Sequence, residues 1–200
     1  MGMVAGTSDI ESVERAVGLF CTEASDVSAA DLGRPTPCAG WDVRALVGHV
    51  AGFYDAVASA LHGERVDLVS ASVDVGDDPR RAIDTAATEM LHAWREPGAL
   101  DRTLATTIRD MPAALATRIV TGDSLLHARD LARALDRPVP MPEDLAPPQL
   151  AMMQQYYDPA TRGPGRGFDV AVEWPEDAPV QERLVALSGR DPGWSPAGEH

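Results

Sequence analysis

Apolar residues recur at helical spacing in four long stretches of the chain. The first begins near Ser8, where Ser8 and Glu11 form a capping-box pattern, and its apolar positions continue to Ala24. The others span about 42–62, start at Asp78-Pro79 and end at Pro97-Gly98, and span about 112–135. Four amphipathic helices with few strand signals predict a mainly α-helical fold, a four-helix bundle with small additions.

Shorter patterns occupy the rest of the chain. The Thr-rich segment 100–109 predicts a short strand or an extended connector. After a proline-rich loop we expect a short helix over 149–157, a turn over 161–167, a strand over 168–174 (FDVAVEW), a last helix over 178–188 and a frayed tail from Gly189. This pattern divides the chain into a bundle over 1–160 and a C-terminal addition over 161–200 that packs on the same domain.

Composition and charge narrow the classes of function. The 200 residues contain 17 Lys+Arg, all of them Arg, and 31 Asp+Glu, giving a formal net charge of −14. Without lysine, Schiff-base chemistry and a P-loop are excluded. The negative charge argues against nucleic acid and anionic membranes as partners. No apolar run reaches the roughly 18 residues of a membrane span, and the N-terminus does not resemble a signal peptide. We therefore expect a cytoplasmic protein with two reduced cysteines, Cys21 and Cys38.

The strongest chemical signal is a carboxylate and an imidazole on one helix. Asp123 and His127 are four residues apart, so both lie on the apolar face of the helix over 112–135. Burying this pair needs compensation, which a divalent metal would supply. His49 borders the apolar stripe of the helix over 42–62 and is the best third ligand. A plain Asp–His hydrogen bond without metal remains the alternative from spacing alone.

Two motifs in this order resemble a known family. Residues 36–49 read TPCAGWDVRALVGH and residues 123–132 read DSLLHARDLA, while the run 175–192 matches a typical C-terminal ending. The chain thereby resembles the mycothiol-dependent maleylpyruvate isomerase-like proteins of the DinB-like metal-binding superfamily, in their short actinobacterial form. The resemblance implies a four-helix bundle, a divalent metal, expected to be Zn²⁺, bound by His49, Asp123 and His127, and mycothiol as a co-substrate.

Some residues depart from the family pattern or have open roles. Arg129 stands where tryptophan is usual and projects about 200° away from His127, so we expect it to be solvated or to line a rim. Candidates for substrate contact are Tyr54, Arg129, Arg162 and Arg166. Cys38, Cys21 and Trp41 are interpreted as packing residues. The isomerase itself carries a further C-terminal domain that we do not expect here, so maleylpyruvate is not the expected substrate.

The functional prediction is a metal-dependent, mycothiol-using enzyme acting on a small electrophilic metabolite by thiol transfer, thiol addition or thiol-assisted isomerisation. A metal-hydroxide hydrolase or lyase in the same pocket is the enzyme alternative. A non-catalytic metal-containing protein that binds a small molecule for resistance, or a member that has lost its metal, would use the same bundle. An apolar face left over after the bundle packs would favour a homodimer.

Overall fold

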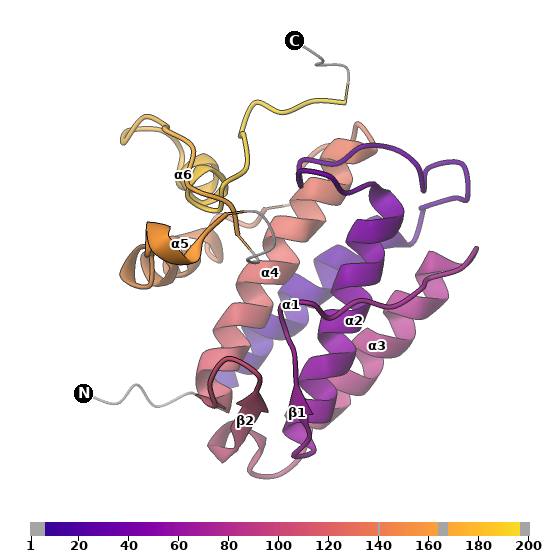
Figure 1. Cartoon of the computed structure of the whole chain (residues 1–200), viewed down its shortest axis with the longest axis vertical. Helices are drawn as coiled ribbons and strands as arrows, with labels where there is room; N and C mark the ends of the chain where they lie inside the picture. Colours follow the sequence, from indigo (N-terminus) through magenta and orange to yellow (C-terminus); the bar gives the residue numbers. More distant parts are fainter. Residues whose placement is uncertain (1–6, 140, 164–167, 197–200) are drawn as a thin grey trace.

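The computed structural model describes residues 7–139, 141–163 and 168–196 (Figure 1). Within these ranges the chain forms six α-helices: α1 (Thr7–Ala24), α2 (Val43–Leu61), α3 (Pro79–Arg95), α4 (Ala113–Ala134), α5 (Ala146–Gln155) and α6 (Val180–Leu187). The mainly helical fold is confirmed, and the four long helices lie within one or two residues of their predicted bounds. Among the described residues no helix combines the length and apolar content that crossing a bilayer requires.

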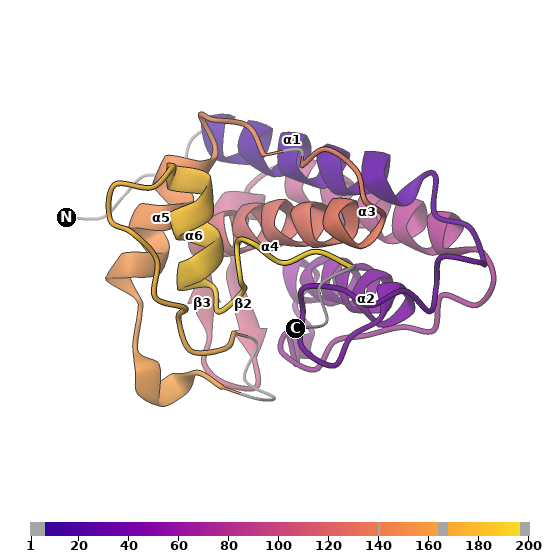
Figure 2. The same ribbon diagram turned by 90° about the horizontal axis from the view of Figure 1, so that it is seen from above.

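The four long helices form the bundle and enclose the main core. Helix α1 packs along α4 and α2 packs along α3, and α1 and α2 lie on opposite sides of the bundle when it is seen from above (Figure 2). Aspartates start two of these helices, because the Asp42 carboxylate accepts a hydrogen bond from the Ala45 amide and Asp78 accepts one from the Arg81 amide. The predicted capping box depends on the side chain of Ser8, and the structure describes only the backbone of that residue.

A small sheet closes one end of the bundle. Strand β1 (Arg65–Val66) runs parallel to β2 (Thr103–Thr106), and β2 pairs antiparallel with β3 (Met111–Pro112). The predicted extended segment over 100–109 thus contains a four-residue strand, preceded by the 3₁₀ turn Ala99–Asp101. The sheet leads the chain directly into the start of α4.

A second, smaller core lies beside the bundle. Helices α5 and α6 pack their apolar faces together and against Leu126 of α4. Helix α5 begins three residues before its predicted start, because two prolines are tolerated in a first helical turn. The boundary expected at residue 160 stays a prediction.

Two expectations for the C-terminal addition are wrong. Residues 168–174 form no strand despite their alternation, since no neighbouring strand pairs with them and the amide of Val172 donates instead to the Ala186 carbonyl. The described tail after Gly189 is not frayed, because Arg190 is 93% buried against the bundle. Its guanidinium binds Asp130 of α4.

An extended segment between β1 and α3 lies directly on α2. A Cβ atom at Gly52 would sit 2.5 Å from the Ser72 backbone, and one at Gly48 would sit 2.6 Å from the Val73 carbonyl oxygen. Gly48 and Gly52 are one helical turn apart, so together they form a shallow track for this segment. The amide of Val73 donates to the Gly48 carbonyl and holds the segment there.

Candidate metal centre

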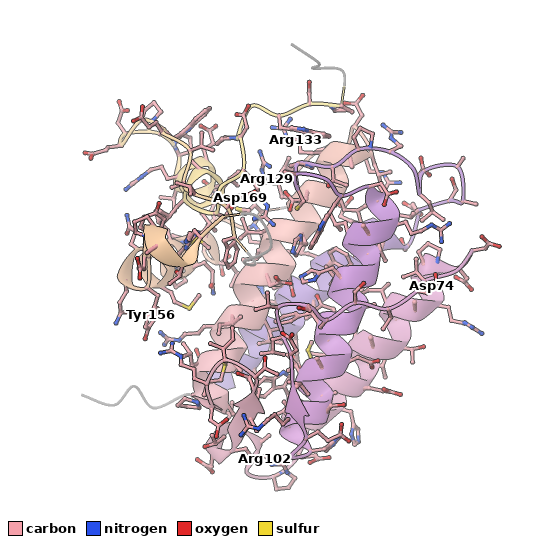
Figure 3. The ribbon with its side chains drawn as sticks, viewed as in Figure 1. Asp74, Arg102, Arg129, Arg133, Tyr156 and Asp169 are labelled. Carbon is pink, nitrogen blue, oxygen red and sulfur yellow. The ribbon has the colours of Figure 1, made fainter. Side chains whose placement is uncertain are left out.

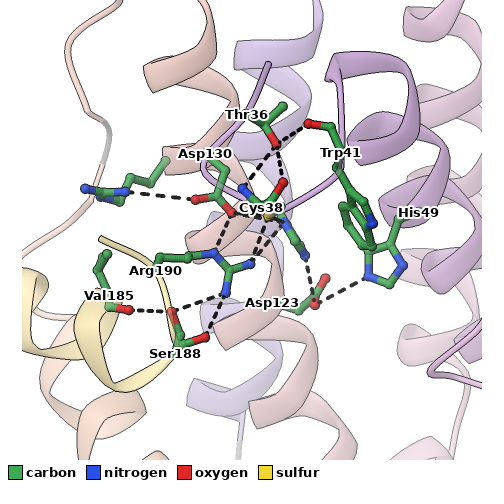
Figure 4. A network of polar contacts seen from close by, with 11 residues as sticks. Thr36, Cys38, Trp41, His49, Asp123, Asp130, Val185, Ser188 and Arg190 are labelled. Carbon is green, nitrogen blue, oxygen red and sulfur yellow. Dashed lines mark hydrogen bonds and ion pairs between the residues drawn. The ribbon is translucent and has the colours of Figure 1, made fainter. Parts of the chain in front are cut away.

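Three predicted ligands converge between α2 and α4 (Figure 4). His49 Nε2 lies 3.9 Å from Asp123 Oδ1, and His127 Nε2 lies 3.5 Å from the same oxygen. One donor atom from each side chain falls within 4.8 Å of the others. The structure therefore brings His49 of α2 together with Asp123 and His127 of α4, more than 70 residues further along the sequence.

Each histidine is oriented by an oxygen behind it. His49 Nδ1 lies 3.2 Å from the carbonyl oxygen of Ala71, on the segment that crosses α2. His127 Nδ1 lies 3.2 Å from Asp130 Oδ2. In the neutral rings these acceptors hold the proton on Nδ1 and leave the Nε2 lone pair facing Asp123, as in histidines that bind metal.

Asp123 has an oxygen without a protein partner. Asp123 Oδ2 is buried and has no hydrogen bond among the described residues. Burial raises the pKa of Asp123, but the charge of His127 and hydrogen bonds to His127 and His49 outweigh it, so the pKa falls well below its usual range. A buried, ionised carboxylate with an unpaired oxygen and two neighbouring imidazoles is a donor set that fits a divalent cation.

His127 is the residue that joins this triad to a second cluster. Burial lowers the pKa of His127. The charge of Asp123 and hydrogen bonds with Asp123, Asp130 and Cys38 raise it by more, so the pKa lies well above its usual value. Asp130 is fully buried as well; burial raises its pKa, while Arg190 and His127 lower it to about 2. The imidazole therefore lies between two carboxylates, one on each side.

The second cluster consists of Cys38, Asp130 and Arg190. Arg190 Nε donates to Asp130 Oδ2 at 2.7 Å, and the Cys38 thiol donates to the same oxygen at 3.2 Å. Cys38, His127 and Asp130 could also supply three metal donors. A guanidinium already neutralises this carboxylate, so a second cation would be repelled. The triad around Asp123 is the better metal site.

Sequence reasoning undervalued several residues of this region. Cys38 was expected only to pack, but it lies among polar groups and lines a cavity. Arg190 lies in the expected frayed tail, 60 residues from its partner Asp130. Trp41, also expected only to pack, has its ring centroid 4.8 Å from that of His49 and 5.9 Å from that of His127. Cys38 and Trp41 lie in the motif over 36–49, which could have identified them. No motif or spacing near Arg190 indicated its role.

Two cavities lie beside the triad. The larger, about 410 Å³, is lined by His49, His127, Trp41, Cys38 and Arg190 together with Ser70, Asp169 and Ser188. The smaller, about 260 Å³, has Asp123 and Gly122 in its wall. Phe168 lines both cavities, so a group bound at Asp123 would lie next to two separate spaces.

The structure separates the four residues predicted to contact substrate. Tyr54 is fully buried and its hydroxyl lies 2.7 Å from Ser124 Oγ, so it is a core residue. Arg129 is 96% buried, not solvated; it donates to the Pro192 carbonyl and lines neither cavity (Figure 3). The Arg129 side chain points away from the triad, as expected, but there it meets the C-terminal segment and not solvent. Arg162 lines the smaller cavity, and Arg166 lies outside the described residues.

Comparison with known proteins places the chain in a family. The family described as "Mycothiol maleylpyruvate isomerase N-terminal domain" matches residues 14–135. An uncharacterised protein of Mycobacterium tuberculosis, found in two strains, is 30% identical over 181 residues, covering 88% of this chain and 94% of the relative. The match to the family extends over both motifs and the three converging side chains.

Two solved structures share the fold. A crystal structure of the mycothiol-dependent maleylpyruvate isomerase has a TM-score of 0.58 and 19% identity, covering 72% of this chain and 67% of that chain. A histidine-to-alanine mutant of that isomerase gives a TM-score of 0.63 at 18% identity, covering 78% and 72%. At these identities the likeness concerns the fold alone. The chain belongs to the family of the mycothiol maleylpyruvate isomerase N-terminal domain.

Proposed function

We propose that this protein is a divalent-metal-dependent enzyme that uses mycothiol, or a similar low-molecular-weight thiol, on a small electrophilic metabolite. The reaction would be thiol transfer, thiol addition or thiol-assisted isomerisation. One observation carries the proposal: the Nε2 atoms of His49 and His127 face Asp123, whose second carboxylate oxygen is buried without a partner. Family membership supports the choice of mycothiol, which the matching family and the similar crystal structures name.

The donor set suits Zn²⁺, which accepts imidazole nitrogens and carboxylate oxygens. An ion held by His49, Asp123 and His127 would lower the pKa of a thiol or water bound to it. The two imidazoles and the carboxylate together carry one negative charge, so a divalent cation would leave the buried site with a net charge of +1. That charge would favour a thiolate there over a neutral thiol.

The surrounding residues would hold this arrangement still. The Ala71 carbonyl and the Asp130 carboxylate fix the two imidazole rings. The Trp41 ring stacks on that of His127 and lies tilted against that of His49, which would limit the movement of both imidazoles. The larger cavity, with Ser70, Ser188 and Arg190 in its wall, offers polar groups for a hydroxyl-rich thiol. We assign the thiol co-substrate to this cavity.

The metal hypothesis is tested first, by elemental analysis of protein purified without chelator. We expect one equivalent of a divalent metal, lost in the double variant His49→Ala/His127→Ala. The matched control is His92→Ala, because His92 is an exposed histidine on α3. Protein that holds no metal even after Zn²⁺ addition would overturn the proposal, and a double variant that keeps its metal would overturn the ligand assignment.

Thiol use is tested next, by incubating metal-loaded protein with mycothiol and a panel of small electrophiles and analysing the products by mass. We expect thiol adducts or isomers that require both metal and mycothiol. Turnover without thiol would identify a metal-hydroxide hydrolase or lyase instead. A metal-loaded protein that binds these compounds unchanged would be a binding or resistance protein. A cytoplasmic location and a homodimer stay predictions.

A further inference from the structure

The smaller cavity beside Asp123 has a mainly apolar wall. Leu115 and Ile119 precede Asp123 by two turns and one turn of α4, so the cavity follows this helix toward its N-terminus. From Leu115 to Asp123 the helix rises about 12 Å. Met152 and Met153 of α5 line the cavity as well, and methionine adapts to irregular apolar ligands. This space suits the apolar body of a small molecule.

Two arginines interrupt that apolar wall. Arg109 lies just before β3 and α4, and Arg162 follows the 3₁₀ turn Pro159–Thr161. The Arg109 guanidinium has no hydrogen-bond or ion-pair partner among the described residues. Arg162 donates to the Leu187 carbonyl at 2.9 Å and lies over the rings of Tyr157, at 4.7 Å, and Phe168, at 5.1 Å. In the described part of the chain, neither guanidinium is paired with a carboxylate.

A guanidinium without a carboxylate partner is not unique to this cavity, because Arg44, Arg81, Arg133 and Arg183 also form no ion pair among the described residues. Acidic residues outnumber basic ones by 31 to 17, and at least nine of the described arginines lie within ion-pair distance of a carboxylate. These pairs include those of Arg15, Arg65, Arg80, Arg95, Arg102, Arg137 and Arg190. Arg109 and Arg162 differ from the four arginines without an ion pair named above because both line one mainly apolar cavity, where they leave planar donor groups available for an external anion.

We infer that this cavity binds a small amphipathic carboxylate, with its apolar body against Leu115, Ile119 and the two methionines. The carboxylate lies at Arg109 and Arg162. The opposite end of the ligand reaches Asp123. The inference deepens the proposed function, because Asp123 belongs to both the cavity and the candidate metal centre. It names the electrophile as a monocarboxylate whose reacting group is separated from the carboxylate by an apolar segment.

Isothermal titration with three probes of eight carbons each tests the inference: octanoate, octan-1-ol and octylamine. The protein is first freed of metal with a chelator, so binding is measured whether or not the metal hypothesis holds. We expect octanoate to bind about tenfold or more tightly than octan-1-ol, because it alone forms charge-assisted hydrogen bonds with the arginines. Octylamine should bind least. Equal binding of the three probes, or no binding of octanoate, would overturn the inference.

Two arginine variants locate the carboxylate. Arg109→Gln and Arg162→Gln should each weaken octanoate about tenfold or more and leave octan-1-ol unchanged. The control is Arg80→Gln, which removes the same charge from an exposed pair on α3 and should change neither ligand. If neither cavity variant alters the octanoate preference, or if Arg80→Gln alters it equally, the inference is wrong.

A third variant tests the apolar part without touching charge. Ile119→Trp should fill the cavity and abolish binding of octanoate and octan-1-ol alike, with circular dichroism confirming that the helices remain. Unchanged binding in a folded Ile119→Trp protein would place the ligand elsewhere. Adding Zn²⁺ and repeating the titration then separates the two hypotheses: octanoate binding by a protein that takes up no metal even after Zn²⁺ addition would refute the proposed function and leave this inference standing.

Discussion

Two carboxylates on α4 flank the same imidazole and have opposite surroundings. Asp123 and Asp130 are seven residues apart, so both lie on the face of the helix that carries His127. Asp130 binds the guanidinium of Arg190 at 2.7 Å and lies 3.9 Å from that of Arg129. Asp123 has only the two imidazoles, and no guanidinium lies within ion-pair distance of it among the described residues.

This difference separates a structural charge from a site. Burying a carboxylate is costly unless a positive charge compensates it. The chain supplies that charge to Asp130 permanently, through an arginine of its C-terminal segment. At Asp123 it supplies only groups that can also bind metal. The asymmetry is the reason for assigning the metal to the Asp123 side of His127.

The largest expected effect is the removal of the cation from Asp130. Arg190→Met should destabilise the protein by about 3–5 kcal/mol, because it leaves a fully buried carboxylate without its main partner. Chemical denaturation of the metal-free protein measures this change in the free energy of unfolding. The double variant Arg190→Met/Asp130→Leu should recover part of the loss, since both charges are then gone. A loss below about 1 kcal/mol in the single variant is what an exposed ion pair gives. It would mean that Asp130 does not depend on a permanent cation and so does not differ from Asp123 in this respect.

The next effect concerns the other carboxylate. Asp123→Ala should cost the metal-free protein less than Arg190→Met, because Asp123 has no permanent cation to lose. It should instead abolish the stabilisation by Zn²⁺, about 2.7 kcal/mol when free Zn²⁺ is 100 times the dissociation constant. Thermal unfolding with and without Zn²⁺ measures both values. If Asp123→Ala kept the full Zn²⁺ stabilisation, the two carboxylates would have been assigned to the wrong roles.

A proton and Zn²⁺ compete for His127, and this competition should give a smaller effect on stability and on metal affinity, with opposite signs. The pKa of His127 is raised in the metal-free protein, so its contribution to stability is full below about pH 6.5 and is lost as the pH rises through the raised pKa. Only the deprotonated ring binds metal, so Zn²⁺ affinity should rise about tenfold per pH unit over the same range. Stability and affinity should therefore change in opposite directions as the pH rises above about 6.5. Chelator competition and denaturation at each pH would reveal any parallel change, which would exclude His127 as a ligand.

Cys38 should give the smallest effect. Its thiol donates to Asp130 Oδ2, so Cys38→Ser keeps a donor and should change the free energy of unfolding by less than about 1 kcal/mol. Cys38→Val removes the donor and should cost about 1 kcal/mol more than the serine variant. Denaturation of both variants measures the contribution of this bond. A larger loss in Cys38→Ser than in Cys38→Val would show that the thiol acts mainly by packing.

Periodicity predicted the parts of the fold that depend on local sequence. The helices with long apolar stripes, capped by Asp42 and Asp78, fall close to their expected ends. The alternation over 168–174 misled, because a strand also needs a neighbour and the fold provides none there. Local pattern therefore identified helices, whose hydrogen bonds are internal, better than strands.

The same distinction applies to the site. Helical spacing put Asp123 and His127 on one face and made His49, which borders the apolar stripe of another helix, the best third ligand; the resemblance supported the same three side chains. Arg190 could not be found this way, because its pairing with Asp130 depends on how the C-terminal segment folds back over α4. Arg129 was expected to be solvated for the same reason, since the segment that buries it is remote in sequence.

The track of Gly48 and Gly52 has a consequence for how this site can vary. The segment that rests on these glycines also presents the Ala71 carbonyl to His49 Nδ1. A methyl group at either position would lift the segment, free the imidazole to rotate, and let either nitrogen face Asp123. The absence of two side chains on one helix thus selects which tautomer of His49 the protein offers, although neither glycine touches anything that reacts.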